Sequence, residues 1–263
     1  MRVVLIGAGR LATNLANALK DSGHHITAVF SHTLLNAQLL SASVGGEATD
    51  NISSLPLSAD VFIIAVKDAV LASVIEELKK GREDQLLLHT AGSMPLSLFG
   101  SHQHAGVFYP MQSFSKERRV DFSEIPIFLE ANDAATLETL KILANSVSRK
   151  VYELSTEERK YLHLAAVFAC NFANHCYALA ADVLEAHGLP FDVMLPLIDE
   201  TARKVHDLHP RDAQTGPAVR YDENVLRSQR ELLADNTDVQ QLYDLLSKSI
   251  HKKQLRINIK HYT

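Results

Sequence analysis

The chain has 263 residues, of which 46% are hydrophobic, and a formal net charge of −5. This length permits two domains and a sizeable buried core. Charges of both signs are spread along the sequence without a basic stripe, which argues against a nucleic-acid-binding protein.

The cellular location is addressed by three features of the sequence. The expected first strand begins at residue 2, which leaves no room for a signal or transit peptide. No apolar run approaches the ~20 residues that a membrane span requires. Cys170 and Cys176 fall on different faces of one expected helix, so they cannot pair there and we expect reduced thiols. Together these features predict a cytoplasmic protein without a membrane segment.

The start of the chain predicts a strand, a glycine turn, a helix and a second strand. Apolar, β-branched runs at 2–6 and 25–30 are typical of buried strands. Between them, Gly7-Ala-Gly9-Arg10-Leu11-Ala12 follows the pattern G-x-G-x-x-A. Gly7 permits a sharp turn, Gly9 lets the backbone approach a pyrophosphate, and the small Ala12 lets the helix pack on the sheet. We therefore expect a dinucleotide with its phosphates at the helix N-terminus; a glycine turn without a nucleotide is the alternative.

The end of the second strand indicates which dinucleotide binds. NAD sites usually place an acidic residue there to accept from the ribose 2′-hydroxyl, but no Asp or Glu occurs between Asp21 and Glu47. Ser31 and His32, with the nearby Arg10, could instead bond to a 2′-phosphate. The sequence therefore predicts NADP; the alternative is that Ser31 and His32 only cap the turn.

Strands and helices alternate through the next hundred residues. We expect helices over 33–44, 69–80 and 133–148, and strands over 61–66, 85–89, 106–110, 126–130 and 150–154. The run 61–66 is apolar throughout, as in a strand buried on both faces. This alternation predicts an α/β fold with a doubly wound, parallel Rossmann sheet.

The pattern becomes purely helical after residue 154. Ser155 and Glu158 form a capping box, and no helix breaker follows until Gly188, so we expect one helix of about thirty residues. Its small, apolar middle requires protein on more than one face. Further helices are expected over 192–208, 222–234 and 237–255. We therefore divide the chain into a dinucleotide-binding domain, 1–154, and a helical substrate and dimerisation domain, 155–263.

Six segments, spread over both expected domains, carry a family resemblance. They are Leu5-Ile-Gly-Ala-Gly-Arg-Leu-Ala12, Ala59-Asp-Val-Phe-Ile-Ile-Ala-Val-Lys67, His89-Thr-Ala-Gly-Ser93, Phe108-Tyr-Pro-Met-Gln112, His163-Leu-Ala-Ala-Val-Phe-Ala-Cys-Asn171 and Thr215-Gly-Pro217. Through them the chain resembles the NADP-dependent oxidoreductases related to pyrroline-5-carboxylate reductase and 6-phosphogluconate dehydrogenase. Within that group it is similar to the subgroup that pairs a Rossmann-like domain with the helical domain called DUF2520. The resemblance implies a helical domain of the 6-phosphogluconate dehydrogenase C-terminal type, NADP in the cleft and a homodimer through the long helix 155–187.

The expected cofactor contacts lie where strands end, because ligands of an open parallel sheet bind beyond the carboxyl ends of its strands. We expect nicotinamide over the loops after the third and fourth predicted strands. The expected contacts, in chain order, are Gly7, Gly9, Arg10, Leu11, Ser31, His32, Ala65, Val66, Lys67, Thr90, Ala91 and Gly92.

Two polar residues of the long helix are the candidates for catalysis. His163 and Asn171 are about 80° apart at 100° per residue, so both can border one cleft. Hydride transfer needs a group that donates a proton, for which His163 is suited, and one that holds developing charge, for which Asn171 is suited. The alternative is two polar residues satisfied at a domain interface.

The favoured hypothesis is that the protein is an NADP-dependent oxidoreductase, which transfers hydride between NADP(H) and a small carbonyl or imine substrate. A non-catalytic nucleotide-binding sensor or scaffold and an F420-linked reductase remain as alternatives. His89, Ser93, Tyr109 and Gln112 face the same rim, and any of them could contact the substrate. Taken singly, each is interpreted as structural. The histidine pairs lack a neighbouring cysteine or paired carboxylate, so no metal site is expected.

Overall fold

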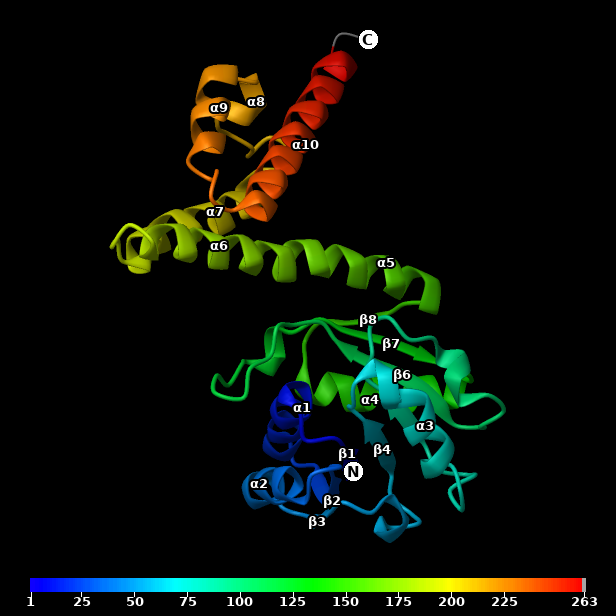
Figure 1. Ribbon diagram of the computed structural model, residues 1–263. Helices are drawn as coiled ribbons and strands as arrows, with labels where there is room; N and C mark the ends of the chain where they lie inside the picture. Colours follow the sequence, from blue (N-terminus) through cyan, green and yellow to red (C-terminus); the bar gives the residue numbers. More distant parts are fainter. Residues whose placement is uncertain (262–263) are drawn as a thin grey trace. The chain divides into compact units, whose positions relative to one another are not determined.

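The computed structural model describes residues 1–261. The chain forms two compact units, Met1–Phe172 and the segment from Ala173 onward, and each is described by itself. This division falls inside the long helical stretch (Figure 1), whereas the sequence places the boundary after Leu154.

Eight strands form the sheet of the first unit: β1 (Arg2–Ile6), β2 (His25–Phe30), β3 (Glu47–Thr49), β4 (Val61–Ile64), β5 (Leu87–His89), β6 (Ala105–Pro110), β7 (Ile127–Ala131) and β8 (Val151–Glu153). Their order is β3-β2-β1-β4-β5-β6-β7-β8. The first six follow the order 3-2-1-4-5-6 of dinucleotide-binding sheets. The predicted doubly wound Rossmann sheet is thereby confirmed.

Two features of the sheet differ from the prediction. Strand β7 runs antiparallel to β6, because the connection between them holds no crossover helix, and a parallel return requires a crossover. Strand β3 was not predicted, because its three residues are too few to show an alternating pattern.

Helices cover both faces of this sheet (Figure 1). Helices α1 (Arg10–Asp21), α2 (Leu34–Val44) and α4 (Ala134–Val147) pack on one face through a core that includes Leu15, Leu40 and Leu140. Helix α3 (Asp68–Leu78) packs on the other face, where Leu71 and Ile75 meet Phe62. Inner strands such as β4 and β5 are therefore buried on both sides, which leaves the ends of the strands as the place where a ligand can bind.

The predicted capping box of the long helix is confirmed, because the Ser155 and Glu158 side chains each accept from the other's backbone N–H. The helical stretch consists of α5 (Thr156–Ala166), a π-helical turn (Val167–Phe172) and α6 (Ala173–Glu185). The π turn was not predicted. It adds a residue to the local turn, so positions on either side do not keep the register of a straight α-helix.

The expected absence of a membrane-length apolar run was wrong. By length and composition, the stretch Thr156–Glu185 is apolar enough to cross a membrane, and none of its most apolar window is buried within the described residues. This is weak evidence for a membrane protein, because a helix buried in a soluble assembly meets the same criteria.

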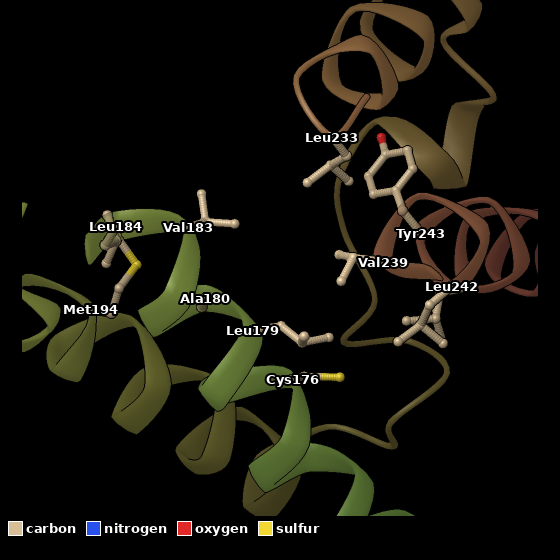
Figure 2. A pocket seen from close by; sticks show the side chains of 11 residues that line it. Cys176, Leu179, Ala180, Val183, Leu184, Met194, Leu233, Val239, Leu242 and Tyr243 are labelled. Carbon is tan, nitrogen blue, oxygen red and sulfur yellow. The ribbon is translucent and has the colours of Figure 1, made fainter. Parts of the chain in front are cut away.

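The second unit consists of helices, and its described side chains form no buried core. It contains α6, a 3₁₀ turn (Phe191–Met194), α7 (Leu195–Asp207), α8 (Pro217–Arg220), α9 (Glu223–Glu231) and α10 (Thr237–His261). Among the side chains that the structure describes in this unit, only that of Ala218 is buried. A pocket of about 390 Å³ lies between α6 and α10, and Figure 2 shows Leu179, Leu242 and Tyr243 on its walls. The unit therefore presents apolar surface that its own fold leaves open.

Candidate functional site

The loops that follow β1, β2 and β4 meet at Gly7. Its backbone has φ +121°, and a Cβ atom added there would lie 2.3 Å from the carbonyl oxygen of Ala65. The Gly7 N–H donates to the Phe30 carbonyl at 2.8 Å, and the Ala65 N–H donates to that of Ile6 at 2.7 Å. Gly7 is thus required by the close approach of two strand ends.

Gly9 lies at the N-terminus of α1 with open space around it. A Cβ atom added to Gly9 would meet nothing within 4 Å. None of the described side chains caps this helix end, and its first turn holds no acidic residue. Unsatisfied N–H groups and the helix dipole favour an anion at such a position. The residues present therefore fit the pyrophosphate of a dinucleotide.

The other predicted cofactor residues lie at neighbouring strand ends. The Ser31 N–H donates to the Thr49 carbonyl at 3.0 Å, and that of Thr90 donates to the Ile64 carbonyl at 3.2 Å. His32 and Lys67 are exposed. The ends of β1, β2, β4 and β5 thus form one continuous rim. Of the remaining predicted contacts, Gly92 is buried, and Leu11, Val66 and Ala91 are partly buried.

A groove of about 630 Å³ begins at the first turn of α1 and runs along α5 and the π turn; we call it the α5 groove. The predicted residues Arg10, His163 and Asn171 all line it. Its described lining contains no acidic side chain. The other lining residues come from the end of β6, from the segment that follows it, and from α5 and the π turn: Tyr109, Met111, Gln112, Ser113, Phe114, Leu162, Ala165, Ala166, Val167, Ala169 and Cys170.

His163 forms a close pair with Tyr109 in this groove. The Tyr109 hydroxyl and His163 Nδ1 are 3.0 Å apart, and the two rings meet edge to face. A Cβ atom added to Gly92 would lie 2.6 Å from His163 Nδ1 and 2.8 Å from Tyr109 Cζ. The loop after β5, where nicotinamide is expected, therefore packs directly against the candidate proton donor.

His89, at the end of β5, is a structural residue of this loop. It is fully buried, stacks on Phe99, and its Nδ1 accepts from the Ala91 N–H at 3.2 Å. Burial, and next the Arg159 charge, lower its pKa to about 4, so the ring is neutral at physiological pH. Its buried Nε2 has no partner in hydrogen-bond geometry among the described residues, although the nearby Pro95 carbonyl acts to raise the pKa of the ring.

Arg159 ties the first turn of α5 to the sheet. Its guanidinium is 1% exposed, pairs with Glu130 on β7 and donates to the Met94 carbonyl at 2.7 Å. Glu130 also accepts from the backbone and hydroxyl of Thr156. The network places α5, and with it His163, over the loop after β5.

Sequence reasoning underrated two of these residues. Tyr109 was interpreted as structural, although it lies within the Phe108-Tyr-Pro-Met-Gln112 segment that marked the resemblance, which is the one available signal. Arg159 carried no signal, because an arginine directly after a capping-box glutamate is ordinarily exposed. In both cases the partner is distant in sequence.

The chain matches two family models: a Rossmann-like domain over residues 1–108 and the domain of unknown function DUF2520 over residues 125–250. A search of curated proteins finds no match. Among solved structures, the chain is similar to the putative NADP oxidoreductase BF3122 from Bacteroides fragilis, with 52% identity, a TM-score of 0.93, and 95% of this chain and 98% of that chain covered.

Two more distant structures share the fold. Protein TM1727 from Thermotoga maritima is 24% identical, with a TM-score of 0.72 over 97% of this chain and 99% of that chain. An imine reductase from Myxococcus stipitatus in complex with NADP⁺ is 16% identical, with a TM-score of 0.69 over 96% of this chain and 93% of that chain. These likenesses extend the Rossmann-plus-helical architecture to the full length of the chain.

Proposed function

Because this chain belongs to the family of the putative NADP oxidoreductase BF3122 and is itself a pyridine-nucleotide oxidoreductase, we propose that its cofactor is NADP. We further propose that its substrate is a small carbonyl or imine compound, or the corresponding alcohol or amine. The comparisons confirm the family that the sequence resembles. The identity of the cofactor and the class of substrate are our proposals.

The observation that carries the cofactor proposal is the open, uncapped N-terminus of α1 at Gly9. Backbone N–H groups there would hold the phosphates. Ser31 and His32, at the end of β2, would bind the 2′-phosphate, and no carboxylate follows on the chain before Glu47 to repel it. Residues 65–67 and 90–92 would border the nicotinamide, since they complete the same rim.

The bound cofactor would supply hydride, and the chain's own residues would supply the rest. The α5 groove holds a substrate of modest size against apolar side chains, which exclude water. His163 is the source of the proton that the reduced oxygen or nitrogen takes up, because an imidazole ring can carry a proton and release it. The Asn171 amide donates to the developing charge.

Titration with NADPH and with NADH tests the cofactor proposal. Ligand at 100 times Kd should stabilise the protein by about 2.7 kcal/mol, with NADPH binding more tightly. Gly9→Asp should abolish binding by bringing a carboxylate to the pyrophosphate, yet leave thermal unfolding without ligand unchanged, because the space around Gly9 is open. Retained affinity in this variant would refute the site assignment. Binding of neither nucleotide would favour an F420-linked enzyme or a scaffold.

We also propose a homodimer through the long helix 155–187. Leu164, Phe168 and Phe172 are at least half exposed on this stretch, and the second unit has an open apolar pocket with hardly a buried side chain around it (Figure 2). Burial against a second copy would supply the missing core. Sedimentation equilibrium should show a dimer that Phe168→Glu weakens; a stable monomer refutes the proposal.

We propose a cytoplasmic location as well, and the free thiols of Cys170 and Cys176 support it.

A further inference from the structure

We propose that Tyr109 is the group that hands the proton to the reduced substrate and that His163 refills it through Nδ1. This inference rests on the proposed function and assigns a new catalytic residue within it. The observation that carries it is the 3.0 Å contact between the Tyr109 hydroxyl and His163 Nδ1 inside the α5 groove. Both side chains line that groove, so a substrate in it can meet the hydroxyl.

The Tyr109 ring is held in place from several sides. It is 8% exposed and belongs to a small apolar cluster with Val107 and Phe128, under Leu162 of α5. Gly92 packs against both the phenol ring and His163 Nδ1, at a distance that leaves no room for a Cβ atom. The hydroxyl can therefore exchange partners by rotating its proton without movement of the ring.

Burial determines which way the proton moves. It raises the pKa of Tyr109, and the Arg159 charge offsets only part of this effect. A phenolate left in the groove is therefore unfavourable, so the hydroxyl can give up its proton only if another proton replaces it. His163 is the titratable group with which the described Tyr109 hydroxyl shares a hydrogen bond.

The proton balance closes in a single relay. Hydride adds to the carbon of C=O or C=N, and the electron pair left on oxygen or nitrogen takes the Tyr109 hydroxyl proton. The cationic His163 passes its Nδ1 proton to the same phenol oxygen, so Tyr109 stays neutral. His163 ends as a neutral imidazole with its remaining proton on Nε2, and solvent protonates it again. In the oxidising direction each proton moves the opposite way.

The relay differs from direct donation by His163 in the tautomer of the neutral ring. In the relay, the resting Tyr109 hydroxyl donates to Nδ1, so neutral His163 carries its proton on Nε2. Direct donation from Nε2 leaves the proton on Nδ1, with the Tyr109 oxygen accepting it. The tautomer can be measured without cofactor or substrate, which separates this inference from the proposed function.

The experiment is long-range ¹H–¹⁵N spectroscopy of the full chain labelled in histidine, with the His163 signal assigned by its loss in His163→Gln. We expect neutral wild-type His163 as the Nε2–H tautomer and a shift toward the Nδ1–H tautomer in Tyr109→Phe. Tyr152→Phe is the matched control, because the Tyr152 ring, like that of Tyr109, packs next to Phe128, but Tyr152 is half exposed. A wild-type Nδ1–H tautomer, or an unchanged tautomer in Tyr109→Phe, overturns the relay.

Steady-state kinetics of NADPH oxidation provide a second readout. The wild type is first tested for reduction of a ketone, cyclohexanone, and a cyclic imine, 1-pyrroline, and the compound that reacts is used for the variants. Tyr109→Phe should lower kcat at least about 100-fold, the usual contribution of a general acid, and leave KM and the Kd for NADPH unchanged. A variant that keeps more than a tenth of the wild-type kcat overturns the proposal. If neither compound reacts, the proposed function is contradicted, and the tautomer still decides the relay.

Discussion

The buried ion pair between Arg159 and Glu130 allows a sharp test of how α5 is fixed above the sheet. The two side chains are 1% and 18% exposed, so neither ion is well solvated. In Glu130→Gln the Arg159 guanidinium keeps its hydrogen bond to the Met94 carbonyl but loses the negative charge that balances its own. Breaking a buried pair on one side costs about 3–5 kcal/mol. Glutamine retains the shape and one oxygen acceptor, so we expect a loss of about 3 kcal/mol.

Urea and thermal unfolding measure this loss. At roughly 2–4 °C per kcal/mol for a chain of this size, the melting temperature should fall by about 6–12 °C. Glu157→Gln is the matched control, because Glu157 pairs with Lys160 on the same helix but in solvent, with side chains 74% and 45% exposed. We expect less than about 0.5 kcal/mol from it.

Equal losses in the two variants would refute the argument from burial. The paired replacement Glu130→Leu with Arg159→Met adds a further check. It removes both charges, so it should recover much of the stability lost in Glu130→Gln. A paired variant no more stable than Glu130→Gln would show that hydrogen bonds, rather than the uncompensated charge, hold the helix.

Three further predictions follow from single positions. Gly7→Ala should lower the free energy of unfolding by at least about 2 kcal/mol, because the position combines a positive φ with a clash against the Ala65 carbonyl. In the same urea-unfolding measurement, the control Gly9→Ala should change this free energy by no more than about 0.5 kcal/mol, because the space around Gly9 is open. His32→Ala should weaken NADPH about tenfold in fluorescence titrations and leave NADH unchanged; equal losses would make His32 structural. The pKa of His89 is 6.5 in the unfolded chain and about 4 in the folded protein, so between these pH values only the unfolded chain takes up the proton. The free energy of unfolding should therefore decrease by up to about 3 kcal/mol as the pH falls from 6.5 to 4. Unfolding curves recorded across that range should show a smaller decrease for His89→Gln.

The nucleotide-binding half of the fold was largely predictable because its signals are local. Strands β1, β2 and β4 are short apolar runs, and the glycine turn occupies a fixed place between a strand and a helix. Once these elements alternate, the right-handed crossover leaves few possible sheet orders. The capping box at Ser155 is likewise complete within four residues, and the structure confirms it.

Pairing between distant strands was less predictable. The direction of β7 depends on its partner β6 across a connection without a helix, and β3 is recognisable only by its ladder with β2. The π turn of Val167–Phe172 also escaped prediction, since a sequence that favours helix does not reveal one extra residue in a turn.

The candidate site divides in the same way. The sequence alone identified Gly7, Gly9 and the strand-end loops, and it singled out His163 and Asn171, because each depends on residue type and near neighbours. Tertiary structure alone decided that Tyr109 meets His163 and that Glu130 meets Arg159, since these partners lie 54 and 29 residues apart. Such contacts depend on how the sheet and α5 pack, and packing is a property of the whole fold that no local pattern encodes.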